Sequence, residues 1–274
     1  MTMTKIGSAN IILIAVSILI AHNLSLADDQ HIKTSDIWNV ELTPYFWVAE
    51  IDGDITLRGR TGPADASFSD IMDNLDIAFM GRTEAWKGKW GLFIDGLYMD
   101  LGSEFSTPQG LVSADMDVKM TILEFGFGYH LWETQVGKEE NQRLSFDMLG
   151  GGRYINLKSE VDIVPNGPLG ILSGRTFRRT EEWVDPIVGG RLQWDMSEKF
   201  AAAVRFDLGG FGIGEGSNLS WNLLAGIDYQ LNDTMKLKAG YRILDMDYEA
   251  GSGNDEFGID AQFRGPIVGL TFLF

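Results

Sequence analysis

Hydrophobic and polar residues alternate with a period of two along most of the chain after residue 37, as in strands with one apolar face. In 200–208 the large apolar residues share one face, while Arg205, Asp207 and small residues share the other. This pattern predicts strands at about 37–51, 77–87, 90–102, 115–132, 143–158, 175–195, 199–213, 218–231, 235–248 and 258–274. The sequence therefore predicts an all-β fold of about ten strands, with about eight or about twelve as alternatives.

Short and long connections alternate between these strands. The short ones are 87–89, 196–198 and 232–233, with 133–142 somewhat longer, and the long ones are 52–76, 103–114, 159–174, 209–217 and 249–257. Outer-membrane barrels have short turns at the periplasmic rim and long loops at the other rim. We therefore expect a closed antiparallel transmembrane β-barrel over 37–274, with both of its ends at the rim of the short turns.

Charged residues of both signs lie on the strand faces opposite the large apolar residues. They are Arg82, Glu84, Asp95, Glu124, Asp147, Arg153, Asp185, Arg191, Arg205, Asp207, Asp228, Lys238 and Arg242. In a narrow lumen an unpaired charge is costly, so we expect a salt-bridged plug. Its expected centre is Arg153, Arg205 and Arg242, paired with Asp147, Asp185 and Asp207. The alternative is a charged constriction that selects solutes.

The last ten residues, GPIVGLTFLF, alternate in the same way as far as Phe274. Their large side chains are expected to face lipid, and aromatic residues near strand ends are expected to form two interfacial girdles. The girdle beside the short turns would contain Trp90, Trp194, Phe200, Tyr229, Phe272 and Phe274. The opposite girdle would contain Tyr98, Tyr154, Phe206 and Trp221.

The N-terminal segment has the features of a secretory signal peptide: Lys5, an apolar run over 11–21, and small residues at Ser25 and Ala27. We expect cleavage after Ala27, a short periplasmic segment at 28–36, and export to the cell outer membrane. After the signal, no apolar run approaches the roughly 18 residues of a spanning helix. The expected domains are thus a signal peptide at 1–27 and a barrel at 37–274.

Composition excludes several classes of function. Asp and Glu number 39 against 22 Lys and Arg, so a nucleic-acid partner is not expected. The chain has no Cys, which excludes disulfides and thiol catalysis. Barrel proteases of the omptin type and barrel phospholipases need a His with acidic partners at the outer rim. His22 and His31 precede the first strand and His130 is predicted near a periplasmic strand end, so we predict no catalytic, cofactor or metal residues and no enzyme activity.

Two loop segments have features of their own. The acidic stretch 245–260 begins with Asp245, Asp247 and Glu249, which could hold a divalent cation, although a solvated acidic loop is favoured. In 67–76, Ser67 followed by Asp70 predicts a capped turn of helix that covers the barrel mouth or packs on it.

Five longer stretches carry a family resemblance. They are PYFWVAEIDGD (44–54), WGLFIDGLYMDLG (90–102), WVDPIVGGR (183–191), GGFGIGEGSNLSW (209–221) and AGYRILDMDYEAG (239–251). Together they resemble a proteobacterial family of outer-membrane β-barrel proteins whose roles are largely uncharacterised. The chain is more loosely similar to the small-barrel superfamily that includes the OmpA transmembrane domain. The resemblance covers nearly all of the mature chain, with 161–180 the part that matches least well, and it implies the fold and the location but no catalytic residues.

The sequence as a whole predicts an integral outer-membrane barrel with a structural, envelope-associated or surface-binding role and a plugged lumen. The alternative is a narrow, porin-like channel for small solutes, and an outer-membrane hydrolase is a distant third hypothesis. Expected partners are outer-membrane lipid and lipopolysaccharide, together with the barrel insertion machinery, because Phe274 resembles the end of its recognition signal. The sequence indicates neither a solute nor an oligomeric state.

Overall fold

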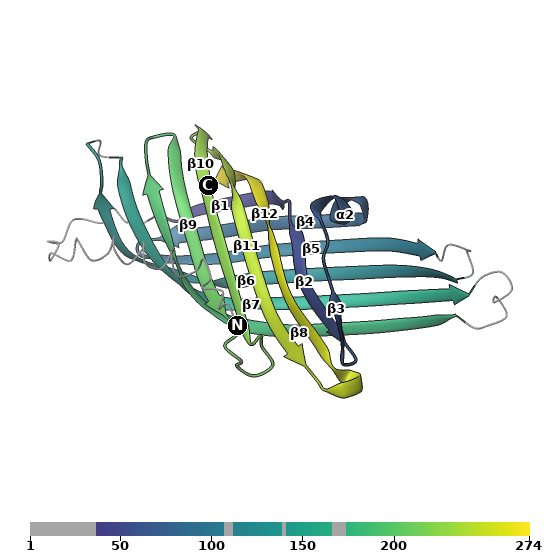
Figure 1. Ribbon diagram of the computed structural model, residues 1–274. Helices are drawn as coiled ribbons and strands as arrows, with labels where there is room; N and C mark the ends of the chain where they lie inside the picture. Colours follow the sequence, from purple (N-terminus) through teal and green to yellow (C-terminus); the bar gives the residue numbers. More distant parts are fainter. Residues whose placement is uncertain (1–36, 107–111, 139–140, 166–173) are drawn as a thin grey trace, which may run out of the picture. The chain divides into compact units, whose positions relative to one another are not determined.

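The computed structural model describes residues 37–106, 112–138, 141–165 and 174–274 (Figure 1). The expected signal peptide and the segment 28–36 lie outside the described residues. The strands are β1 Asn39–Trp47, β2 Glu50–Leu57, β3 Arg60–Pro63, β4 Leu75–Lys87, β5 Trp90–Ser106, β6 Val112–Gln135, β7 Arg143–Pro165, β8 Arg175–Asp195, β9 Phe200–Gly209, β10 Leu219–Asn232, β11 Met235–Ala250 and β12 Phe257–Leu273. The helical elements are α2 Phe68–Asp73 and the 3₁₀ turn η2 Gly253–Asp255.

Ten of these strands close into a barrel, because β1 pairs with β4 on one side and with β12 on the other. The remaining strands of the ring follow in sequence order from β4 to β12, joined by antiparallel hairpins. Closure satisfies the backbone groups that an open sheet leaves unpaired at its edges. The predicted closed, all-β, antiparallel barrel is therefore confirmed.

The two ends of the barrel differ as the connection lengths predicted. At one end, which we call the turn end, the described strands are joined by the short segments 88–89, 196–199 and 233–234. At the other, the loop end, β6 and β7 extend to Val112 and Pro165, well into predicted loops. The two strands remain paired over these extensions, but the outward side chains of β7 there, Glu160 and Asp162, are polar. The apolar alternation that marks a strand in sequence is therefore missing there.

The first predicted strand, 37–51, is divided in the structure. β1 pairs with residues Ile267–Leu273 of β12, whereas β2 pairs with Phe257–Arg264 of the same strand and continues into a hairpin with β3. β2 and β3 thus occupy part of the segment 52–76 that the sequence predicted to be a loop. They add two strands to the sheet without entering the closed ring.

This division leaves a gap in strand pairing, which we call the seam. Pairing between β1 and β4 ends at Pro44 and Gly81, and in the described chain no pairing joins β2 to β4. Across the seam, the Trp47 backbone N–H donates to Met80 Sδ at 3.3 Å. Side chains, rather than a ladder of backbone hydrogen bonds, therefore close the wall between 45–51 and 75–80.

Helix α2 lies beside the seam, close to the loop end of β4 (Figure 1). The Asp70 N–H donates to Ser67 Oγ, and the Ser67 N–H donates to Asp70 Oδ2, so the predicted capping box is present. Ile71 is the buried residue of the helix. A helix of six residues is too short to be stable alone, so its packing against the barrel wall holds it in place.

The outward face of the barrel is an apolar belt. Phe79 is 73% exposed and Val268 52%, and both alternate along their strands with buried inward residues. Of the predicted girdle beside the turns, Trp90, Trp194, Phe200 and Phe274 are exposed. Among the described residues no helix is long and apolar enough to cross a membrane. Exposed apolar side chains in this number require an apolar surrounding, and a bilayer supplies it.

Candidate functional site: the barrel lumen

Inward side chains divide the lumen into two regions that meet within single strands. Across β5, β6 and β7, the register aligns Asp95, Glu124 and Arg153 in one row. The next inward row toward the loop end is Leu97, Ile122 and Ile155. We call the charged region the plug and the apolar region the chamber. The boundary falls between adjacent inward positions, so a two-residue step along a strand changes the environment completely.

Glu124 on β6 is the hub of the plug. Its Oε1 accepts from Arg153 Nε at 3.0 Å and from Arg242 Nη2 at 2.9 Å, and its Oε2 accepts from Arg205 Nη2 at 2.7 Å. Glu124 and Arg153 are both 0% exposed. A carboxylate removed from water in this way is stabilised only if charged donors saturate it, and the three guanidinium groups do so.

The contacts of the plug cross the bore. β6 and β11 lie opposite each other in the ring, and the Glu124–Arg242 pair joins them. Arg153 on β7 also reaches Asp207 on β9 and donates to Ser220 Oγ on β10 at 3.2 Å. Side chains from opposite walls of the ring therefore meet within the lumen at this level.

A second tier of the plug lies toward the turn end. Arg191 on β8 donates to Glu84 on β4 at 2.7 Å and to Asp147 at 2.8 Å. Arg82 pairs with Glu84 at 2.6 Å and with Asp95 at 3.2 Å. This tier also links walls that are not neighbours, so the contacts across the lumen do not depend on the Glu124 hub alone.

The structure corrects the predicted pairing. Of the expected partners, Asp207 is confirmed, because both Arg153 and Arg205 bind it. Asp147 instead binds Arg191 and His130, and Asp185 accepts from the hydroxyls of Ser217 and Ser220 and from the Ser217 N–H. The actual hub, Glu124, was predicted to face the lumen but was not among the expected partners. Strand alternation predicts which face of the sheet a residue lies on. It does not predict which residues meet across the bore, because those contacts form only when the ring closes.

The chamber is the larger hydrophobic cluster of the described chain. Its buried members are Trp47, Met80, Leu97, Met120, Ile122, Ile155, Leu157, Trp183, Leu244, Met246, Tyr248, Phe257, Ile259, Ala261 and Phe263. Trp183 and Tyr248 stack with ring centroids 3.8 Å apart, and Trp183 Nε1 donates to Ser217 Oγ at 2.9 Å. The predicted lumen residues were charged, and this apolar region was not predicted, although the same alternation places its residues on the inward face.

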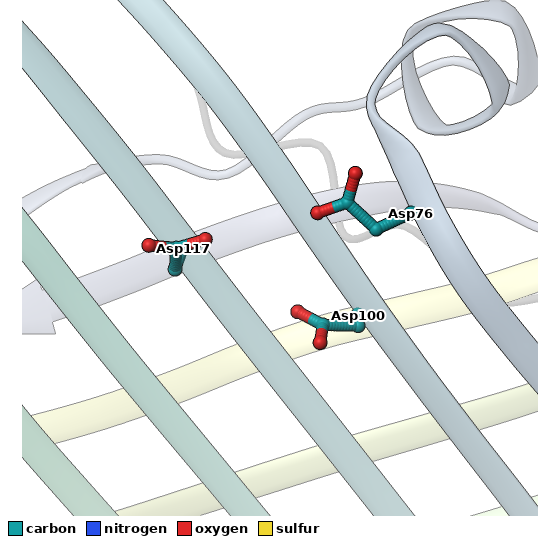
Figure 2. A group of neighbouring side chains, drawn as sticks. All are labelled: Asp76, Asp100 and Asp117. Carbon is teal, nitrogen blue, oxygen red and sulfur yellow. The ribbon is translucent and has the colours of Figure 1, made fainter.

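Carboxylates converge at a different place from the one considered in the sequence. Asp245, Asp247 and Glu249 follow one another along β11, where Asp245 accepts from Gln262 and Asp247 from Asn218. Asp76, Asp100 and Asp117 on β4, β5 and β6 lie together instead (Figure 2), and one carboxylate oxygen of each lies within 4.8 Å of the others.

Such oxygens suit a hard divalent cation, but Lys119 Nζ already binds Asp100 Oδ2 at 2.6 Å. Exposed acidic groups often lie close together on strand surfaces without binding a metal ion. We therefore assign no ion to Asp76, Asp100 and Asp117.

His130, near the turn end, is the one histidine among the described residues. Its Nδ1 lies 2.8 Å from Asp147 Oδ1, and its Nε2 lies 3.8 Å from Glu133 Oε2. This agrees with the predicted position near a strand end beside the short turns. The imidazole is held by the second tier of the plug and lies away from the loop end.

No protein-family model matches the chain, and no curated protein sequence matches it. Solved structures do match. The outer membrane protease OmpT from Escherichia coli superposes with a TM-score of 0.55 at 9% identity, covering 90% of this chain and 100% of that chain. The attachment invasion locus protein Ail of Yersinia pestis gives a TM-score of 0.34 at 11% identity, covering 86% and 98%. The translocator domain of the autotransporter NalP from Neisseria meningitidis gives 0.36 at 14% identity, covering 97% of each chain.

At identities this low, a structural match is evidence for the fold alone. That evidence comes from the OmpT superposition. The closed barrel, its exposed apolar belt and this similarity define the class of the protein. The chain is an integral outer-membrane β-barrel protein.

Proposed function

We propose that this protein is a non-conducting barrel with a structural and surface-binding role in the outer membrane. The observation that carries the proposal is the Glu124–Arg242 contact at 2.9 Å, which joins opposite walls of the ring. Pore-lining charges that select ions keep water between them. The charges here bind each other directly and are almost fully buried, as at Asp207, which is 1% exposed.

Conductance in planar bilayers tests the proposal. The purified full chain is expected to show no steady conductance, because the two tiers of the plug close the bore. Arg205→Ala should lower the free energy of unfolding by about 2 kcal/mol, since a charged hydrogen bond to Glu124 and an ion pair with Asp207 are lost. Arg178→Ala is the matched control, because Arg178 pairs with Glu160 on the exposed face and such pairs contribute little.

A steady, ion-selective conductance of the wild type would contradict the proposal. If Arg205→Ala changed that selectivity without changing stability, the narrow channel would be the correct function. If the wild type is silent and only Arg205→Ala leaks, the plug is supported as the element that closes the bore.

The proposed orientation places the turn end in the periplasm, where outer-membrane barrels have their short turns. In this chain, which has no Cys of its own, a cysteine at Gly88 or Asp233 should resist a membrane-impermeant thiol reagent on intact cells. A cysteine at Gly62 in the β2–β3 hairpin should react. Labelling at Gly88 with protection at Gly62 would reverse the orientation.

We also propose that the strand ending in Phe274 is recognised by the barrel insertion machinery. Phe274 is 75% exposed at the turn end, and its N–H and C=O bond to Val40 of the neighbouring strand. A chain ending at Leu273 should be degraded or remain in the periplasm, as measured by fractionation and immunoblotting. A normal amount of this shortened chain in the outer membrane would exclude the proposed signal.

The proposed role is non-catalytic. OmpT is named a protease, but the likeness to it is one of fold. The described histidine, His130, bonds to Asp147 near the turn end, whereas the proposed outer surface is the loop end. An assay of the purified barrel for peptide and ester hydrolysis tests this, and activity abolished by His130→Ala would contradict it.

A further inference from the structure

An apolar cavity lies at the seam, between α2 and the barrel wall. Its volume is about 30 Å³, and every lining residue is hydrophobic. Met72, Met80, Met99 and Met120 all line it, out of 11 Met in the whole chain. Methionine is unbranched and polarizable, so it adapts its shape to irregular apolar partners. The concentration of methionine makes this pocket more deformable than a pocket lined by branched residues would be.

The cavity is next to the lipid-facing surface. Phe46 lines it and is also 40% exposed on the outside of β1, and Phe79 and Ile77 on β4 are 73% and 56% exposed. Between these strands the seam has no backbone ladder. The Trp47 N–H instead bonds to the thioether of Met80, which is a weak acceptor. The wall can therefore open here without breaking a ladder of backbone hydrogen bonds.

The floor of the cavity is sealed. The Trp47 ring lines the cavity, and the Arg242 guanidinium of the plug lies 5.0 Å from the centroid of this ring. The Trp47 indole N–H donates to the Gly265 carbonyl, so it presents no unpaired donor to the cavity. A ligand therefore meets hydrocarbon on all sides and finds no exit toward the turn end. These conditions favour an aliphatic chain and exclude a polar solute.

We propose that one acyl chain of an outer-membrane lipid enters through the seam and lies between α2 and the chamber. The cavity as it stands equals about one water molecule's share of liquid volume, so the chain must displace apolar side chains of α2. Phe68, Ile71 and Met72 are those side chains. The inference deepens the proposed surface-binding role by naming its ligand class, and it rests on that proposal for the closed floor.

Photo-crosslinking in vesicles tests the inference. The full chain is reconstituted with a phosphatidylcholine that bears a diazirine on one acyl chain, and labelled residues are mapped by mass spectrometry. Lipid that only surrounds the barrel reaches outward residues such as Ile94. Lipid with an acyl chain in the cavity should also label Leu97, Met99 or Met120, which line the cavity from inside the ring. Labels confined to outward residues would overturn it.

A matched pair of variants tests whether the labelling lipid chain lies in the cavity. Ala78→Phe fills the cavity from β4, and labelling of inward residues is expected to fall about tenfold, because the new ring competes for the same space. Ala85→Phe makes the same change on the outward face of β4 and should leave both sets of labels unchanged. Equal inward labelling in Ala78→Phe and wild type would place the lipid chain elsewhere.

The test separates this inference from the proposed function. A barrel that is silent in planar bilayers but shows only outward labels keeps the plug and loses the lipid site. A diazirine-bearing fatty acid added from water tests the source of the chain. Inward labelling by that acid, with none from the phospholipid, would overturn lateral entry.

Discussion

The plug and the chamber are built on the same strands but are held together by different interactions. In the plug, Glu124 is surrounded by three arginines at 2.7–3.0 Å, and each contact has a required partner and direction. In the chamber, Ile155 and Leu244 are equally buried, at 0% exposed, but their packing has no directional requirement. The plug should therefore tolerate almost no substitution, whereas the chamber should tolerate changes that conserve volume.

The position of the seam follows the same difference between plug and chamber. It opens into the chamber, where apolar side chains rearrange without losing hydrogen bonds. A similar gap beside the plug would leave buried charges unpaired. The seam therefore lies in a region that can accept another apolar group.

The largest effect is expected from Glu124→Ala. The substitution leaves Arg153, Arg205 and Arg242 without their shared carboxylate, and breaking such buried pairs costs about 3–5 kcal/mol. Urea unfolding in detergent micelles, followed by tryptophan fluorescence, measures the loss. Glu160→Ala, on the exposed face, is the control and should change little. A loss below 1 kcal/mol in Glu124→Ala would show that the plug is not a cooperative unit.

A smaller but clear loss is expected from Ile155→Ala in the chamber. Removing buried methylene groups leaves a cavity, which costs about 3 kcal/mol, whereas Ile155→Val should cost only about 1 kcal/mol. Ile94→Ala is the control, because Ile94 is 57% exposed on the outward face. The same unfolding assay applies. If Ile155→Val proved as damaging as Glu124→Ala, the chamber would be as specific in its packing as the plug.

Met80→Leu tests the link across the seam. Leucine keeps the volume but cannot accept the Trp47 N–H, so the expected loss is about 1 kcal/mol. The more specific readout is hydrogen exchange of the Trp47 amide, which should accelerate while the amides of β6 and β7 keep their protection. Unchanged exchange at Trp47 would mean that the thioether contact does not hold the seam.

The smallest effect is expected from Ser67→Ala at the start of α2. Loss of the N-cap should cost about 1 kcal/mol and should be confined to the helix. The hydrogen bonds from Ser67 lower the pKa of Asp70, so their contribution is present above the ordinary carboxyl pKa and is lost as pH falls through the lowered value. Hydrogen exchange of residues 68–73 at several pH values measures this. Ser67→Ala removes the hydroxyl but keeps the backbone N–H of residue 67, so the pH dependence should shrink; an undiminished pH dependence would assign it to another group.

The amino-acid sequence was enough to predict the closed antiparallel barrel and its inward charges. Period-two alternation gave the face of Arg153, Asp207 and Arg242, and short and long connections gave the two ends, because both signals are local. The capping box of Ser67 and Asp70 was also readable, since its partners are three residues apart.

Tertiary structure alone decided which inward residues touch. The hub at Glu124 depends on ring closure, because Arg242 comes from the opposite wall. The seam forms because β12 pairs first with β2 and then with β1 along the same edge. Residues 75–80 of β4 are therefore left without a partner on β1. Alternation carries no information about distance across a lumen or about which of two segments a strand edge will choose. Those choices follow from packing the whole ring at once.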